Sequence, residues 1–506
     1  MYLSRLSVVW IVGIFSFLAV IVSYQYAEKR LVSLSVPQDY QYFYGLAVRA
    51  GNLNYVQQLP VQIIGRNIFF VGDVSGTEAK DNLYKSIHFE PIKYGLISLY
   101  RFIPHVEILF LFYSILFFLP LLYFSYVAVR KIPGLIVLLL SLLYIFFPSS
   151  INISAENIRP YNLFAPIILI TYTAILFKRP RWEQISALGA LAFIREEGLF
   201  FALPLVGVVW LEAYRNRAHI WRAMMPYISV WLLAAITTVL YFVWSGYRFV
   251  PVEYGDIPSW IIPVFFLLLA ITAIAAIVRI TIKRNSFLTG AALLYLMPLF
   301  AFGHRIIADI HFSGDLGAFF KNLVFTFVFG RYYMPVIAII ICLYAACAAY
   351  KIVLKKEITV LLLGCIVAAT LVVDFSANHG FYNQYISSNI RTADAALVWD
   401  TKNLLMSINP RGMVITDTKT MSAFVDYDNA YDFRWLPQWV SGGSMEYPEN
   451  IESLYKLVRG STHIIVSAES IPEITKIIGG ADVIATVVAE NNSFRIYEIK
   501  MTQSPY

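Results

Sequence analysis

The chain has 506 residues, of which 59% are hydrophobic and 14% are charged, and its mean hydropathy is +0.65. These values exclude a soluble globular protein and are typical of a polytopic membrane protein. The formal net charge of +7 does not indicate nucleic-acid binding, because the basic residues fall mostly in short loops between apolar runs, where they set membrane topology.

The first apolar run extends from Val8 to Tyr24 and is followed by polar and charged residues, with no small-residue cleavage site. We therefore predict an uncleaved first helix with a cytoplasmic N-terminus. Residues 27–105 are mixed in composition and are too long for a turn, so they are expected to form a structured first outer loop. Further membrane helices are expected at residues 106–129, 135–147, 161–177, 225–244, 260–280, 287–302, 323–350 and 358–373.

The apolar run 185–211 is interrupted by three charged residues, Arg195, Glu196 and Glu197. Basic clusters stand before and after the run, so both of its ends are predicted to face the cytoplasm. Each half is short for a membrane span, which favours a hairpin of two short helices with the charges at its outer tip. Charges at that depth are costly unless they face a wet cavity with partners. A structural ion pair at a loop tip is the alternative interpretation.

The basic clusters all fall on one side if the chain crosses the membrane about eleven times. Residues 1–374 then form the transmembrane domain, and residues 375–506 form a small extracytoplasmic α/β domain. In this second domain strands are expected at 413–416, 463–466, 485–488 and 494–499, and helices at 451–458 and 471–478. No glycine-rich phosphate loop accompanies these strands, so no nucleotide site is indicated. The predicted fold class is a polytopic α-helical membrane protein with a small C-terminal α/β domain.

In this topology the outer loops open on one face, and that face collects charged and ionisable side chains. The candidate site residues are Asp39, His88, Glu90, Glu156, Arg159, Arg195, Glu196, Glu197, His304, Arg305 and Arg331. Arginine binds phosphate through a bidentate fork, and a carboxylate accepts the proton of an incoming hydroxyl, so the set suits chemistry on an anionic lipid-linked group. Each residue also has a plainer interpretation as a turn residue, a helix-start pair or a snorkelling side chain. A divalent cation stays open as a cofactor, although no ligand spacing demands one.

Four short segments occur in a fixed order along the chain: Asp39, His88-Phe89-Glu90-Pro91, Arg195-Glu196-Glu197-Gly198 and Arg331-Tyr332-Tyr333-Met334-Pro335. Together they resemble the motifs of the GT-C superfamily of integral membrane glycosyltransferases. More narrowly, they are similar to those of a family of predicted bacterial and archaeal membrane proteins with an outer-loop aspartate, a His-Phe-Ser-Pro segment and a Lys/Arg-Glu-Asp triplet. This chain departs from that pattern at Glu90, which stands for the serine, and at Glu197, which stands for the aspartate.

The resemblance implies a transferase in the plasma (inner) membrane that uses a polyprenyl-phosphate-linked sugar and an acceptor that is a glycan, a lipid or a protein. Asp39 would be the general base, and Arg195, Arg305 or Arg331 would hold the phosphate. Glu196, Glu197, Glu156 and His88 would position sugar hydroxyls, the acceptor or a metal ion.

Two other classes of function remain open at this point. In a transporter or flippase for a lipid-linked or anionic envelope precursor, the same charges would line a translocation path. Such proteins usually contain two related halves with paired discontinuous helices, and the sequence has one interrupted hairpin. The other class is an envelope assembly protein without catalytic activity.

Overall fold

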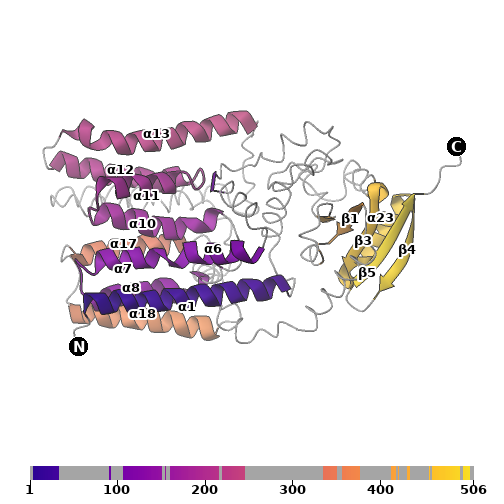
Figure 1. Cartoon of the computed structure of the whole chain (residues 1–506), viewed down its shortest axis with the longest axis horizontal. Coiled ribbons are helices and arrows are strands. Elements are labelled where there is room, and N and C mark those ends of the chain that lie inside the picture. The colour runs from indigo at the N-terminus through magenta and orange to yellow at the C-terminus, as the bar shows by residue number, and fades with distance from the viewer. Residues whose placement is uncertain are drawn as a thin grey trace, which may run out of the picture.

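The computed structural model describes residues 4–32, 91–92, 106–150, 154, 160–215, 219–245, 334–349, 356–376, 412–417, 420, 430–432, 455, 458–490 and 494–501. Within these residues, helices lie side by side in a bundle, and a β-sheet lies beyond one end of it (Figure 1). The helices of the bundle are α1 (Arg5–Val32), α6 (Val106–Phe118), α7 (Pro120–Ala128), α8 (Gly134–Phe146), α10 (Phe164–Leu176), α11 (Arg181–Ala192), α12 (Gly198–Arg215), α13 (Ile220–Ser245), α17 (Met334–Ala349) and α18 (Lys356–Ser376).

These helices are those of a polytopic helical membrane protein. Among the described residues, the segments 5–27, 110–128 and 220–241 are long and apolar enough to cross a bilayer, and shorter apolar helices accompany them. A span of about 20 apolar residues is required because no water is present in the bilayer core to bind free backbone groups. The expected spans at 260–280 and 287–302 lie outside the described residues, so the predicted number of crossings remains a prediction.

Several helix limits differ from those expected from hydropathy. The helix predicted at 106–129 is divided at Leu119, because Pro120 has no N–H group and its ring clashes with the preceding turn. Helices α11 and α13 begin four or five residues before the expected 185 and 225, at Arg181 and Ile220. The added first turns contain tryptophan and arginine, which lower the local hydropathy but are tolerated in a helix.

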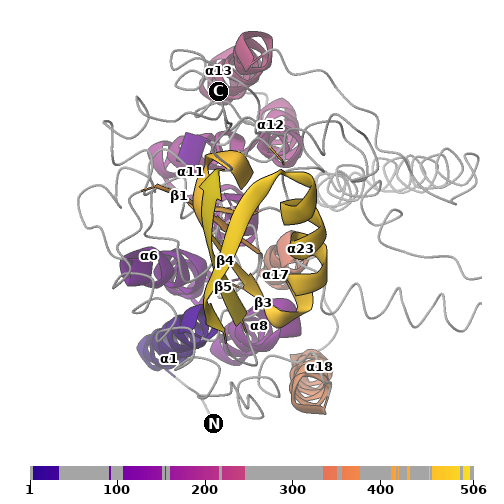
Figure 2. The same cartoon turned by 90° about the vertical axis from the view of Figure 1, so that its right-hand side faces the viewer.

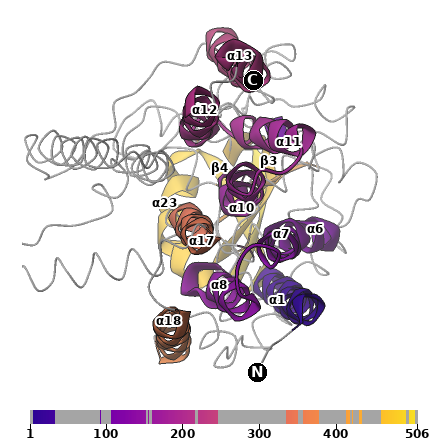
Figure 3. The same cartoon turned by 90° about the vertical axis from the view of Figure 1, so that its left-hand side faces the viewer.

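Helix α10 lies at the centre of the bundle, with α7, α11 and α17 around it (Figure 3). Most of its side chains are buried, and it contains no charged residue. The hydroxyl of its Thr171 donates to the carbonyl oxygen of Ile167 (2.7 Å) and to that of Ala187 in α11 (3.0 Å). The second of these contacts ties α11 to the centre of the bundle.

The N-terminus of α1 and the turns α7–α8 and α10–α11 lie at one end of the bundle, away from the sheet (Figure 1). These turns contain the basic residues Arg130, Lys131, Lys178 and Arg179. The shared sidedness agrees with the topology expected from the charges. That this end faces the cytoplasm remains a prediction.

The sheet has five strands in the order β2-β1-β3-β5-β4. Strands β2 (Ala430–Asp432), β1 (Met413–Thr416) and β3 (Ser461–Ser467) run parallel, whereas β5 (Phe494–Met501) is antiparallel to β3 and to β4 (Val483–Glu490). Helix α23 (Ile471–Gly480) packs on one face of the sheet through Ile474 and Ile477 (Figure 2). The strand at 413–416 has the predicted limits and the other predicted strands are longer than expected, while the predicted helix at 451–458 lies mostly outside the described residues.

A buried carboxylate joins the ends of the two parallel strands β1 and β3. Asp417 directly follows β1 and is 0% exposed. Its Oδ2 accepts hydrogen bonds from the backbone N–H of Ser467 (2.9 Å) and from the hydroxyls of Ser467 and Ser470, and its Oδ1 accepts one from the N–H of Thr420 (2.8 Å). Burial alone would raise the pKa of the Asp417 carboxyl, but the hydrogen bonds from Ser467, Ser470 and Thr420 hold that pKa below its ordinary value.

Asp417→Asn is expected to destabilise the sheet by at least about 2 kcal/mol at neutral pH, because hydrogen bonds to a charged acceptor are lost. Since the folded pKa is depressed, this contribution is present above the unfolded pKa of about 4 and disappears as the pH falls through the folded value. The loss of stability is measured by amide hydrogen exchange of β3 in the full-length protein. Asp482→Asn, at an exposed position of the same sheet region, is the control, and equal exchange in both variants would contradict the assignment.

Candidate functional site

The charged triplet lies at the tip of a helical hairpin, as the sequence predicts. Helix α11 has 12 residues and α12 has 18, so the second helix is longer than expected. Between them the backbone turns within five residues, 193–197. The N–H of Phe193 donates to the carbonyl oxygen of Gly189 (3.0 Å), and that of Gly198 donates to the carbonyl oxygen of Arg195 (2.8 Å). The chain therefore passes from one helix directly into the next.

Gly198 makes this tight turn possible. A Cβ atom at this position would be 2.1 Å from the carbonyl oxygen of Leu191 in the preceding helix. That distance is far inside van der Waals contact, and the opposing atom belongs to the backbone, which cannot rotate away. Only glycine allows α12 to begin this close to the end of α11.

The three charged side chains of the tip form one ion-paired group. The Nε of Arg195 lies 2.9 Å from Oε2 of Glu197 and 3.4 Å from Oε1 of Glu196. The side chain of Arg195 is 6% exposed, against 19% for Glu196 and 13% for Glu197. The guanidinium is thus enclosed by protein, and Glu196 is the more accessible of its two carboxylate partners.

One aromatic ring lies beside this group, and further rings pack behind it. The guanidinium carbon of Arg195 lies 5.7 Å from the centre of the Tyr161 ring, which favours the cation through the ring's quadrupole. Tyr161 belongs to the short 3₁₀ helix η1 (Pro160–Leu163) that precedes α10. Its ring packs edge-on against Phe164, and Phe164 in turn contacts Phe201 of α12. The rings connect the tip to the start of α10.

The start of α17 reaches the same end of the bundle. Met334, its first residue, has its sulfur 3.4 Å from the Ser150 hydroxyl and 3.8 Å from the Ser149 hydroxyl, just after α8. Nearby segments are joined by a second serine group, in which the Ser23 hydroxyl lies 2.9 Å from that of Ser114 and 2.8 Å from that of Ser154. The first group joins the end of α8 to the start of α17, and the second joins α1 to α6. Sequence reasoning missed these serines and Tyr161, because uncharged residues within apolar runs or directly beside them give no distinctive signal.

Of the residues predicted from the sequence, the structure brings together Arg195, Glu196 and Glu197. The other candidates lie outside the described residues, so their convergence on the tip stays a prediction; they are Asp39, His88, Glu90, Glu156, Arg159, His304, Arg305 and Arg331. Within the described part of the chain no group of three or more His, Cys, Asp or Glu side chains could hold a metal ion.

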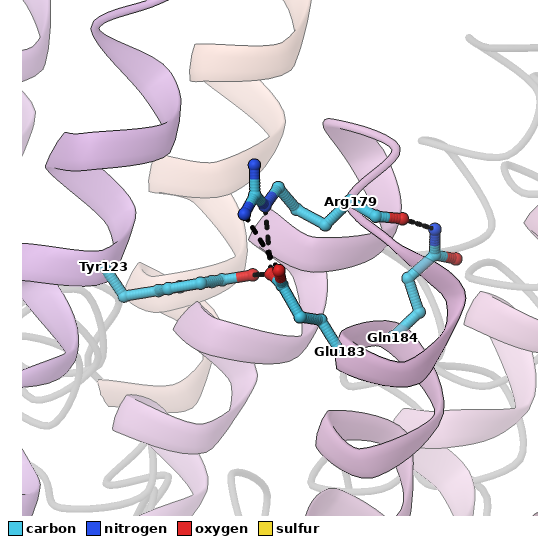
Figure 4. A network of polar contacts seen from close by, with 4 residues as sticks. All are labelled: Tyr123, Arg179, Glu183 and Gln184. Carbon is cyan, nitrogen blue, oxygen red and sulfur yellow. Dashed lines mark hydrogen bonds and ion pairs between the residues drawn. The ribbon is translucent and has the colours of Figure 1, made fainter.

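A second polar network holds the opposite end of the hairpin (Figure 4). The carboxylate of Glu183 in the first turn of α11 accepts hydrogen bonds from Nε (2.9 Å) and Nη2 (2.8 Å) of Arg179, and from the Tyr123 hydroxyl of α7 (2.6 Å). The next residue, Gln184, donates to the carbonyl oxygen of Arg179 and accepts a hydrogen bond from the Tyr227 hydroxyl of α13 (2.8 Å). The network fixes the base of α11 between α7 and α13.

At the tip end, α13 also holds α12. The indole Nε1 of Trp231 donates to the carbonyl oxygen of Leu199 at 3.0 Å. The hairpin is therefore bonded to its neighbours at its base by Glu183, at mid-height through the carbonyl oxygen of Ala187, and near the tip at Leu199. These contacts set the position of the charged group within the bundle.

Tyr123→Phe is expected to lower the free energy of unfolding by about 1–2 kcal/mol, because the charged acceptor Glu183 loses a hydrogen bond. The measurement is the unfolding midpoint of the purified protein in detergent. Tyr126→Phe is the matched control: this exposed tyrosine, three residues further along α7, keeps the ring that faces Arg130. A midpoint that falls equally in both variants would rule out the role given to the network.

Comparison with known proteins gives one structural similarity. No protein-family model matches the sequence, and no curated protein matches it. Among solved structures, the fold is similar to the crystal structure of ArnT from Cupriavidus metallidurans in the apo state, over 96% of this chain and 97% of that one. The TM-score is 0.44 and the sequence identity is 12%, so neither the activity nor any residue of that protein carries over to this chain.

Proposed function

We propose that this protein is a membrane glycosyltransferase that moves a sugar from a polyprenyl-phosphate donor to an acceptor hydroxyl at the end of the bundle that holds the hairpin tip. The observation that carries the proposal is the enclosed Arg195–Glu196–Glu197 group at the tip of two short helices. Ionised side chains at membrane depth are costly, and where they occur they usually mark a substrate path or a reaction site. The order of the four motifs in the sequence supports the same reaction class.

The contacts of Arg195 change the roles assigned to the three candidate arginines. Its Nε is already engaged by two carboxylates, so a phosphate would compete with both for the same group. Arg305 or Arg331 therefore binds the donor phosphate, and Arg195 orients Glu196. The more accessible carboxylate of Glu196 then accepts hydrogen bonds from sugar or acceptor hydroxyls.

Chain connectivity supports the presence of further candidates at this end of the bundle. Arg159 directly precedes Pro160 of η1, and Arg331 precedes Met334 of α17 by three residues. Successive Cα atoms are about 3.8 Å apart, so the backbone of Arg331 is tethered within about 11 Å of that of Met334. Tyr161 and Met334 both belong to the group of segments that meets at the tip end.

The proposed reaction is a single displacement in which Asp39 accepts the proton of the acceptor hydroxyl. Asp39 removes the proton of the acceptor hydroxyl, the oxygen attacks the anomeric carbon of the sugar, and the bond from that carbon to the phosphate oxygen breaks. The polyprenyl phosphate leaves with the bonding electrons, and the developing charge on its oxygens is stabilised by arginine.

The proposal is tested by replacing Asp39 with Asn in cells that depend on the protein for a surface glycan. Loss of a general base is expected to lower product formation about 100-fold or more, with normal amounts of folded protein in the membrane. Asp73→Asn, in the same predicted outer loop, is the control and is expected to leave the product unchanged. Unchanged product with Asp39→Asn would exclude Asp39 as the base.

A further inference from the structure

Exposed tryptophans stand beside arginines at the end of the bundle opposite the hairpin tip. Trp182 is 69% exposed and Trp221 is 74% exposed, and each is the second residue of its helix, α11 and α13. Arg181 precedes the first tryptophan and Arg222 follows the second, and both arginines are exposed. Tryptophan has a large apolar ring and one polar N–H group, so water on most of its surface is unfavourable.

The same pairing of ring and cation recurs at the α7–α8 turn. Tyr126 is 45% exposed, and the guanidinium of Arg130 lies 4.1 Å from the centre of its ring. We call these six residues the anchor ring: Trp182, Trp221, Tyr126, Arg181, Arg222 and Arg130. All belong to the ends of helices, or to turns, at the basic end of the bundle (Figure 1).

We propose that the anchor ring binds the headgroup layer of one leaflet and selects anionic phospholipids there. Tryptophan and tyrosine favour the membrane–water interface, where the ring meets acyl chains and the polar atom meets headgroups. Arginine binds lipid phosphates, and a basic residue close to an anionic surface contributes about 1 kcal/mol. A leaflet of zwitterionic lipids interacts favourably with the tryptophan and tyrosine side chains only. An anionic leaflet also interacts favourably with the arginines.

This anchorage fixes the depth of the charged tip. Helix α11 begins in the anchor ring and has 12 residues, which at about 1.5 Å per residue advance about 18 Å. The hydrocarbon core of a bilayer is about 30 Å thick. The Arg195–Glu197 group therefore lies within the depth of the acyl chains, about 10 Å short of the far interface. A lipid-linked substrate would meet it from within the bilayer plane.

The lipid-facing side of α11 provides a ruler for this depth. Trp182, Ser186 and Ala190 are all exposed and are spaced four residues apart, so they lie along one face of the helix. The experiment attaches a nitroxide to Trp182→Cys, Ser186→Cys or Ala190→Cys in a background with the three native cysteines replaced by alanine, in proteoliposomes containing phosphatidylglycerol. The relative accessibility to oxygen and to a water-soluble nickel complex is expected to shift toward oxygen from 182 to 190. An aqueous signal at 190, or no gradient, would overturn the assigned depth.

The lipid preference is measured separately with spin-labelled phosphatidylglycerol and phosphatidylcholine. Replacing Arg181 and Arg222 by Gln is expected to reduce the preference for phosphatidylglycerol by up to about fivefold per residue. Lys476→Gln, an exposed charge on α23, is the control and is expected to leave the preference unchanged. An unaltered preference in the double variant would overturn the anionic selectivity. Neither measurement requires catalytic activity, so the outcome is independent of the proposed function.

Discussion

Arg195→Met is expected to lower the free energy of unfolding by up to about 3–5 kcal/mol, because two partly buried carboxylates lose their buried cation. Methionine has most of the volume of the aliphatic part of arginine, so the loss of stability measures the removed charge and not a new cavity. Arg195 has 6% exposed side chain and is paired with both Glu196 and Glu197, which makes this the largest electrostatic effect expected in the hairpin. Unfolding in detergent can be followed by the reaction of the buried thiol of Cys342 with a fluorescent reagent, in a chain whose Cys347 and exposed Cys365 are replaced by alanine.

Arg181→Met is the control for this prediction. Arg181 belongs to the same hairpin but is exposed at the base of α11, where surface charges contribute little to stability in detergent. Equal stability of the Arg195 and Arg181 variants would show that the charged tip is not an enclosed ion-paired group. The proposed site would then lose its structural basis.

Gly198→Ala is expected to separate the two helices of the hairpin at the tip. The new methyl group would lie 2.1 Å from the carbonyl oxygen of Leu191, so the backbone must move, at a cost of about 1–3 kcal/mol or more. The movement also displaces Glu197, which directly precedes Gly198, and activity should fall together with stability. The thermal unfolding midpoint and the yield of transferred glycan measure the two effects.

Gly207→Ala provides a matched control within the same helix. A Cβ atom at Gly207 would meet nothing within 4 Å, so alanine there is expected to be neutral or to stabilise α12 by up to about 1 kcal/mol through its higher helix propensity. If Gly198→Ala were as stable as Gly207→Ala, the two helices could not approach each other as closely at Gly198 as the structure shows.

Charge and hydropathy predict the hairpin because ionised groups are costly to bury. Charged residues are therefore rare inside apolar runs, and where they occur they stand out in the sequence. Three charges inside an apolar run mark the tip at 193–197, and β1 and α23 follow from short apolar patterns between turn residues. Helix limits are less predictable where tryptophan and arginine begin a helix, as at α11 and α13. The division at Leu119 follows from Pro120, whose missing N–H group outweighs the apolar residues on both sides.

The polar networks could not be predicted, because they join residues that are far apart in the sequence. Tyr123 and Glu183 are 60 positions apart, and Asp417 and Ser467 are 50 apart. A tyrosine in an apolar helix and an aspartate after a short strand each have many possible partners. Tertiary packing determines which partner each residue meets, and a single sequence does not reveal it. The same reason keeps the approach of Asp39 to the hairpin tip a prediction.

The most direct test of the central claim is the profile of lipid-linked sugars and surface glycans in cells that lack the protein. We expect one polyprenyl-phosphate-linked sugar to accumulate and a glycan containing the same sugar to disappear, with both changes reversed by the wild-type chain and neither by Asp39→Asn. Profiles identical to those of the parent cells would contradict a transferase that draws on a lipid-linked donor.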